Sequence, residues 1–227
     1  MVIEHARRLI ANGQARAAMH VPLGPEIGQC CGGRVAVSLD HADAARRQAL
    51  LAQVAAEDGA LPHVYVFGAG HVGRALAQML ALLPVQLEVI DTLALLPSHI
   101  AARTVAMPEA VVRSAPSGSS FVILTHDHAL DFLIAQESLA RVDSPYIGMV
   151  GSATKRARFA SWYLGEGGSA QALDRLVLPI GQQGLGDKRP AVIAALAAAE
   201  IMVHIGQWEA ETGRVRTPET SGVAIGH

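Results

Sequence analysis

The spacing of apolar residues divides the chain into a short N-terminal part and a longer part in which strands and helices alternate. In the N-terminal part, helical spacing predicts helices over 2–12 and from 41 to about 57. Between them, strands are expected at 15–21 and 34–40, separated by LGPEIGQCCGG, whose four glycines and proline interrupt any regular element. This order predicts a small α+β segment over residues 1–60.

Beyond residue 60, short apolar runs alternate with helical patterns. Strands are predicted at 63–68, 85–91, 102–108, 119–127, 145–152 and 175–181. Helices are predicted at 71–83, after the strand 119–127 to about 140, at 154–164 and at 190–205. Strands that are apolar throughout are typical of parallel strands buried on both faces. We therefore expect an α/β fold with a doubly wound, mainly parallel Rossmann-like sheet over 61–205, and a flexible tail over 206–227.

The sequence GAGHVG at 68–73 matches the G-x-G-x-x-G pattern of phosphate-binding turns. It follows a predicted strand and opens a predicted helix, and Asp91 ends the next strand 23 residues after Gly68. In such turns Gly68 permits the tight turn, Gly70 lets the backbone approach a pyrophosphate, and Gly73 lets helix and strand pack closely. Asp91 favours NAD over NADP, because its carboxylate repels a 2′-phosphate. His71 either touches a phosphate or faces solvent, and the alternative for the whole turn is a Rossmann-like sheet that binds no ligand.

Ligands of open α/β sheets lie outside the carboxyl ends of the strands, where three further segments end. The candidate binding residues in these segments are Thr125, His126, Asp127, Gly151, Ser152 and Gly181. His126 and His128 leave open a metal site or acid–base chemistry near neutral pH. The alternative is that Asp127 caps the following helix. The basic cluster KRAR at 155–158 is within reach of an anionic ligand, although such clusters on a helix usually face solvent.

Composition narrows the class of protein. Of the 227 residues, 51% are hydrophobic and 17% charged, which excludes a disordered polyelectrolyte. The 18 basic and 20 acidic residues, with 4% aromatics, argue against nucleic-acid binding. The N-terminus lacks the apolar core of a signal peptide, and the apolar stretch 191–205 is shorter than the roughly 20 residues that span a bilayer. With two cysteines and no disulfide framework, we expect a soluble, cytoplasmic protein without nucleic-acid or membrane partners.

The two cysteines, Cys30 and Cys31, are adjacent in a glycine-rich segment. Neighbouring Cα atoms are ~3.8 Å apart, below the ~4.4–6.8 Å that is usual for a disulfide, so a bridge between them would be strained. Two thiols on a flexible loop can instead bind a soft metal, because thiolates prefer soft ions. The alternative is a pair of small, buried apolar residues.

Five stretches of the chain carry a resemblance when they are taken together. They are LGPEIGQCCGGRV (23–35), VYVFGAGHVGRAL (64–76), THDHALD (125–131), YIGMVGSATKRARF (146–159) and PIGQQGLGDKRPAVIAALAAAEI (179–201). In this order they resemble the XdhC/CoxI family of xanthine dehydrogenase accessory proteins, and the last is more similar to the xanthine dehydrogenase branch than to the carbon monoxide dehydrogenase branch. The chain departs from the family in beginning at its first helix, without the usual glycine-rich stretch before it, and in having Leu93 where arginine is common.

The resemblance implies a chaperone-like protein that binds the molybdenum cofactor, assists its sulfuration and hands it to a molybdenum hydroxylase, xanthine dehydrogenase. That cofactor is a pterin dithiolene with a phosphate. Cys30 and Cys31 are therefore expected near the molybdenum, and the glycine turn near a phosphate or a nucleotide such as NAD. The partners that the resemblance implies are the apoenzyme, a cysteine desulfurase and further copies of the chain.

Two other functions remain open. A small NAD-dependent oxidoreductase fits the glycine turn, but no Tyr-x-x-x-Lys or comparable acid–base set accompanies it. A nucleotidyltransferase acting on the cofactor needs metal-binding carboxylates near the phosphates, and Asp91 and Asp127 are its only candidates.

Overall fold

The computed structural model describes residues 1–24, 32–92, 102–181 and 186–214. The chain forms two compact units, one from Met1 to Glu57 and one that begins at Asp58. Cys30 and Cys31, with the sequence predictions made for them, lie outside the described residues.

The N-terminal unit contains the four elements that the sequence predicts. They are α1 (Val2–Ala11), β1 (Arg16–Leu23), β2 (Gly33–Asp40) and α2 (Ala44–Gly59), the last of which ends just beyond the unit. The strands pair in antiparallel register with Arg16 opposite Asp40, and Arg16 Nε lies 2.8 Å from Asp40 Oδ1. Side chains along β2 alternate between half-buried and exposed, as in a two-stranded sheet with one covered face.

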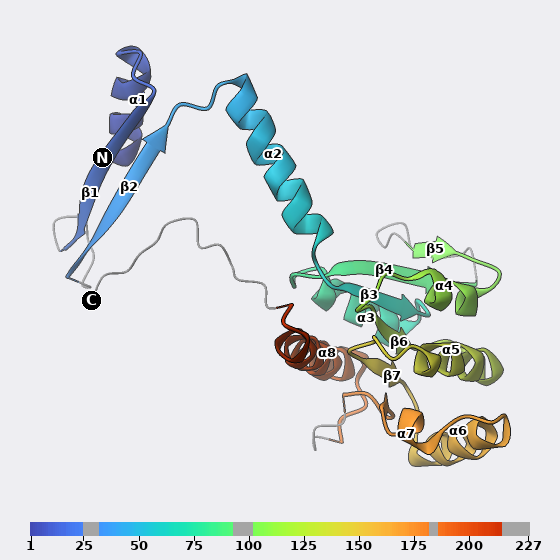
Figure 1. Cartoon of the computed structure of the whole chain (residues 1–227). Coiled ribbons are helices and arrows are strands. Elements are labelled where there is room, and N and C mark those ends of the chain that lie inside the picture. The colour runs from blue at the N-terminus through green and yellow to red at the C-terminus, as the bar shows by residue number, and fades with distance from the viewer. Residues whose placement is uncertain (25–31, 93–101, 182–185, 215–227) are drawn as a thin grey trace. The chain divides into compact units, whose positions relative to one another are not determined.

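The second unit is built around a parallel sheet. Its elements are β3 (His63–Phe67), α3 (His71–Leu80), β4 (Gln86–Asp91), β5 (Ala102–Thr104), α4 (Pro108–Ser114), β6 (Ser120–Ile123), α5 (His128–Ala140), β7 (Ile147–Met149), α6 (Ala153–Gly165), α7 (Ala170–Leu173), β8 (Leu176–Val177) and α8 (Pro190–Thr212). The six strands lie in the order β5-β4-β3-β6-β7-β8, and each neighbouring pair is parallel. The strands from β5 to β7 are labelled in Figure 1. This is the doubly wound, Rossmann-like sheet that the sequence predicts.

Both faces of this sheet are covered, which explains the continuously apolar strands. Along β3, Val64 and Val66 pack with α3 and α8, while Tyr65 and Phe67 pack on the opposite face with α4, α5 and α6. Each face therefore has its own apolar core, and a strand between two cores has no position for a solvent-facing side chain. β6, next to β3, is buried at all four of its residues.

Several element bounds differ from those predicted. β5 ends at Thr104 rather than at 108, because Pro108 occupies the first turn of α4, a helix that the sequence pattern did not reveal. α8 continues to Thr212, into the segment predicted as a tail from 206, and ends at Gly213 with φ of 69°. A glycine in this left-handed conformation is a common end of a helix, so Gly213 marks the end of α8 in the sequence.

The longer α8 also corrects the expectation that its apolar stretch is too short to span a bilayer. Of the described helices, α8 alone is long and apolar enough, by length and hydropathy, to cross a membrane. One of its faces is nevertheless buried in the core that it shares with α3 and the sheet. That face comprises Ala194, Ala197, Ala198, Ile201 and Ile205. Small residues on this face let α8 lie close to its neighbours, as a core helix does.

Candidate functional site

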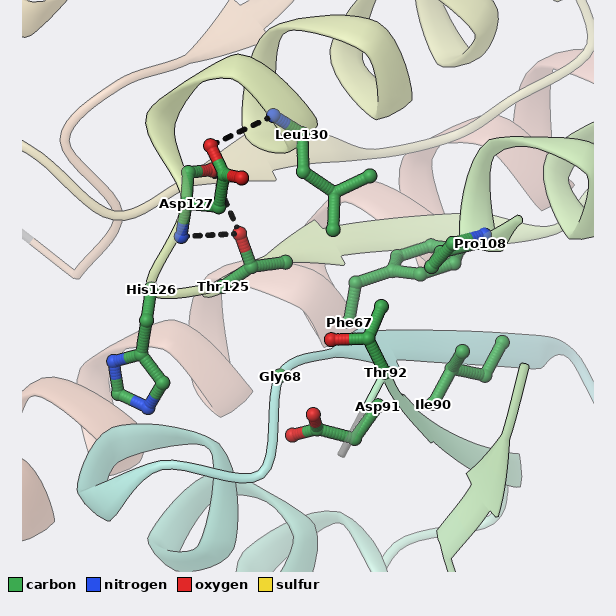
Figure 2. Close-up of a pocket in the computed structure, with 10 residues that line it drawn as sticks. All are labelled: Phe67, Gly68, Ile90, Asp91, Thr92, Pro108, Thr125, His126, Asp127 and Leu130. Atoms are coloured by element: carbon green, nitrogen blue, oxygen red, sulfur yellow. Dashed lines mark hydrogen bonds between the residues drawn. The ribbon is translucent and has the colours of Figure 1, made fainter. Parts of the chain in front are cut away.

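A cleft lies at the carboxyl ends of β3, β4 and β6. From β3 the chain continues to β4 on one side of the sheet, whereas β6 pairs with β3 on the other side. This reversal is the topological switch point at which open α/β sheets bind ligands. The cleft has a volume of about 220 Å³ (Figure 2). Its lining residues are Phe67, Gly68, Ile90, Asp91, Thr92, Pro108, Thr125, His126, Asp127 and Leu130.

The glycine turn begins at the cleft with Gly68, and two of its glycines leave no room for a side chain. Gly68 has φ of +106°, and a Cβ atom there would lie 2.4 Å from the carbonyl oxygen of Leu124. A Cβ on Gly73 would lie 2.0 Å from the carbonyl oxygen of Gly68. Any other residue at either position therefore forces the backbone apart, as the sequence motif predicts for the tight turn and the close helix.

Asp91 braces the glycine turn. Its Oδ2 accepts a hydrogen bond of 2.7 Å from the backbone N–H of Ala69, and its side chain lines the cleft beside Gly68 (Figure 2). The residue predicted to bind a ribose therefore stands at the cleft and also fixes the shape of the turn. A charged acceptor makes such a hydrogen bond stronger than one between neutral groups.

Gly70 and His126 bring the turn and the loop after β6 together. Gly70 is the N-cap of α3 and has no side chain with which to cap the first amides of the helix. A Cβ on Gly70 would lie 3.0 Å from His126 Cε1 and 3.2 Å from His126 Nε2, so the imidazole lies against the glycine. An anion at these amides would meet the edge of the imidazole as well. His71, the next residue, is exposed.

The loop after β6 is held by two carboxylates. Asp127 Oδ1 accepts hydrogen bonds from the amides of Ala129 (2.8 Å) and Leu130 (3.3 Å), so Asp127 caps α5. Asp131, one turn into α5, accepts hydrogen bonds from the Thr125 amide (3.1 Å) and from Thr125 Oγ1 (2.7 Å). The helix-cap alternative for Asp127 is confirmed.

The two histidines of this loop lie in different places. His126 lines the cleft, whereas His128 lines a separate apolar groove with Phe132, Leu133 and Trp162. Within the described ranges, no three His, Cys, Asp or Glu side chains come together to hold a metal ion. In the His-Asp-His segment, His126 lines the cleft, Asp127 lines the cleft and caps α5, and His128 lines the groove.

Sequence reasoning missed Asp131 and was wrong about Lys155. Lys155, expected to face solvent, is 9% exposed, and its Nζ pairs with Asp131, which is fully buried. Its Nζ also donates to the carbonyl oxygen of Val150 at 2.9 Å. Arg156, beside it, donates to the carbonyl oxygens of Leu176 and Leu178 at 2.9 and 3.1 Å. These basic residues tie loops together instead of forming a solvated face.

The remaining candidates lie at the same sheet edge but do not line the cleft. The hydroxyl of Ser152 accepts a hydrogen bond of 3.3 Å from the Lys155 amide and caps α6. The side chain of Lys155 crosses Gly151, where a Cβ would lie 2.6 Å from Lys155 Cδ. Gly181 has φ of +63°, and a Cβ there would lie 2.8 Å from the carbonyl oxygen of Ile193 in α8. These three residues shape loops and helix packing.

Comparison with known proteins identifies the family to which the chain belongs. The model of the XdhC Rossmann domain family matches residues 64–201, which is more than half of the chain. No curated protein matches it. A solved structure described as a xanthine dehydrogenase from Bacillus halodurans has 17% sequence identity and a TM-score of 0.67, covering 97% of this chain and 81% of that one. At this identity the likeness shows the fold. The match to the Rossmann-domain model shows that this chain belongs to the XdhC family.

Proposed function

We propose that this protein is an accessory protein of xanthine dehydrogenase, which binds the molybdenum cofactor and assists its sulfuration and its insertion into the apoenzyme. The observation that carries the proposal is the XdhC Rossmann domain match over residues 64–201, on a chain whose glycine turn starts, at Gly68, in a cleft at the switch point of the sheet. The proposal includes a cytoplasmic location, a cysteine desulfurase as sulfur donor, and assembly with further copies of the chain.

The cleft fits a phosphate next to a flat ring. The first amides of α3 have no side-chain cap at Gly70 and favour an anion, and the His126 imidazole, which lines the cleft, lies against Gly70 beside them. The cleft also has an apolar wall, formed by Phe67, Ile90, Pro108 and Leu130. A pterin with a phosphate offers both chemistries. The cleft holds about 220 Å³, which suits one end of such a molecule.

The metal end of the cofactor needs soft donors. The proposal assigns this role to Cys30 and Cys31, because thiolates bind soft metals and because the described residues bring no three-ligand cluster together. When bound, the cofactor supplies the molybdenum centre that the client enzyme uses. The chain itself would bind and orient the phosphate end through the glycine turn and hold the metal end through its thiols.

Asp91 extends the proposal to nucleotides. Its carboxylate stands at the end of β4, lines the cleft and braces the glycine turn, which is the position of a ribose-binding carboxylate. We infer that any dinucleotide taken up here is NAD rather than NADP, because a carboxylate accepts a hydroxyl hydrogen bond and repels a phosphate.

The cysteine variants Cys30→Ser and Cys31→Ser test the proposal. Serine keeps the size of cysteine but is a harder and less readily ionised ligand, so each variant is expected to retain less cofactor while melting at the wild-type temperature. If the cysteines are buried core residues instead, each serine lowers stability by about 1–3 kcal/mol and leaves binding by the folded fraction unchanged. Measuring melting and retained pterin on the same samples separates these outcomes. A double serine variant that retains wild-type amounts of cofactor contradicts the role of the thiols.

A further inference from the structure

The ion pair between Lys155 and Asp131 is a buried feature that the family match does not explain. Lys155 is 9% exposed and Asp131 is fully buried, so both charges have left water. Replacing a buried ion pair by apolar residues of similar size is often neutral or stabilising. A contribution to the stability of the fold is therefore a weak explanation for the presence of this ion pair.

The hydrogen bonds of Asp131 connect the ion pair to Thr125, which lines the cleft. Asp131 uses one carboxylate oxygen for Lys155 and the other for Thr125, whose amide and hydroxyl donate at 3.1 and 2.7 Å. The residue after Thr125 is His126, whose imidazole lies against Gly70. A continuous path of contacts thus runs from α6 through α5 to the loop after β6 and on to the glycine turn.

The N-terminal cap of α5 does not require this path. Asp127 already caps α5 through the amides of Ala129 and Leu130, so α5 has its N-terminal acceptor without Asp131. The loop after β7 is in turn shaped around Lys155, since Gly151 has no space for a Cβ beneath the lysine side chain. The second anchor of Lys155 is the Val150 carbonyl oxygen, in that same loop.

We infer that Asp131 and Lys155 are positioning residues, which hold Thr125 and His126 against the glycine turn so that the cleft is preformed for its ligand. This inference rests on the proposed function for the identity of the ligand. Neither residue lines the cleft, so neither is assigned a contact with the ligand. The pair acts on binding through the backbone and hydroxyl of Thr125.

The double variant Asp131→Leu/Lys155→Met separates positioning from stability. It removes both charges. Methionine has nearly the volume of lysine, and leucine keeps the branched shape of aspartate with two methyl groups in place of the carboxylate oxygens, so the melting temperature is expected to stay within several degrees of wild type. It also removes the acceptor of the Thr125 amide. Amide exchange at Thr125 is therefore expected to accelerate at least about tenfold, the change for one lost hydrogen bond to a charged acceptor. The matched control is Tyr146→Phe, which removes the hydrogen bond of 2.5 Å that the buried Tyr146 donates to Glu200, away from the cleft.

Three measurements on wild type, the double variant and the control decide the inference: melting temperature, amide exchange at Thr125, and the pterin that copurifies with protein made in a cofactor-producing host. A double variant with near-wild-type melting, faster exchange and at least about tenfold less pterin supports positioning. Wild-type exchange in the double variant overturns it, as does a Tyr146→Phe protein that loses as much pterin. If wild-type protein retains no pterin, the proposed function fails, and the exchange at Thr125 still decides the positioning claim.

Discussion

Replacing Gly70 by valine is expected to remove ligand binding and leave the fold in place. A Cβ at this position would lie 3.0 Å from His126 Cε1, which is 0.4 Å nearer than the 3.4 Å at which ordinary van der Waals contact begins. The neighbour is the free end of a side chain, so the imidazole can rotate away. The γ carbons of valine then occupy the space from which an anion would approach the first amides of α3.

The size of both effects follows from the contacts. A residue other than glycine at this N-cap costs about 1 kcal/mol, which corresponds to roughly 2–4 °C in the melting temperature of a unit of this size. Loss of one hydrogen bond between an amide and a charged phosphate costs about 1.5–3 kcal/mol, or about 10- to 150-fold in affinity. The expected signature is therefore a small change in melting with a large loss of retained cofactor.

Two further glycine variants provide the comparison. Gly206→Val places the same side chain on α8 at a position where a Cβ has no neighbour within 4 Å outside the adjacent residues and the helix's own backbone, so it controls for the added volume. Gly73→Ala places a Cβ 2.0 Å from the Gly68 carbonyl oxygen, a backbone clash that no side-chain rotation relieves, and it is expected to unfold the turn. Pterin retained by purified protein and thermal melting are the assays. A Gly70→Val protein that retains as much pterin as Gly206→Val refutes the assignment of the turn as the phosphate site.

Three other predictions concern Asp91 in the cleft, Gly151 in the loop after β7, and the ion pair of Asp143 with Arg141. Calorimetry on the wild-type protein should show tighter binding of NAD than of NADP because of Asp91, and the reverse order would contradict that role. Gly151→Ala should lower the melting temperature, because the new Cβ displaces the Lys155 side chain. An unchanged melting curve would contradict this, because the loop after β7 would then accommodate the Cβ at no cost in stability. Two hydrogen bonds from the Arg141 guanidinium hold the pKa of Asp143 at about 2, below its usual value, so this carboxylate stabilises the fold above about pH 4 and that stabilisation is lost as the pH falls through 2. Wild type should therefore exceed Asp143→Asn by about 1–2 kcal/mol in urea unfolding at neutral pH and by less at pH 3, whereas a difference that does not change with pH would contradict the pairing.

The sheet could be predicted from the sequence because its strands are recognisable as continuous apolar runs. β3 and β6 lie between two apolar cores and are apolar at nearly every position, and the G-x-G-x-x-G turn requires glycine for steric reasons that hold wherever it occurs. α4 was missed because its seven residues are too few for a helical period to show, although Pro108 marks its start.

The role of Lys155 could not be predicted from local pattern. Its position among basic residues of a helix indicates a solvated face, and only the fold brings it to Asp131, 24 residues away in the sequence. The same holds for the contact between His126 and Gly70, which joins the ends of two strands that are neighbours in the sheet but not in the chain. Long-range pairing of this kind depends on topology, so the sequence indicates the residue types without indicating their partners.

The proposed function is tested most directly by measuring transfer of the molybdenum cofactor from this protein to apo-xanthine dehydrogenase. Cofactor-loaded protein is incubated with apo-xanthine dehydrogenase, and the recovered hydroxylase activity is compared with that produced by free cofactor at the same concentration. The expected result is higher recovery with the loaded protein, abolished in Gly70→Val and retained in Gly206→Val. Recovery no greater than that with free cofactor would contradict a role in cofactor insertion.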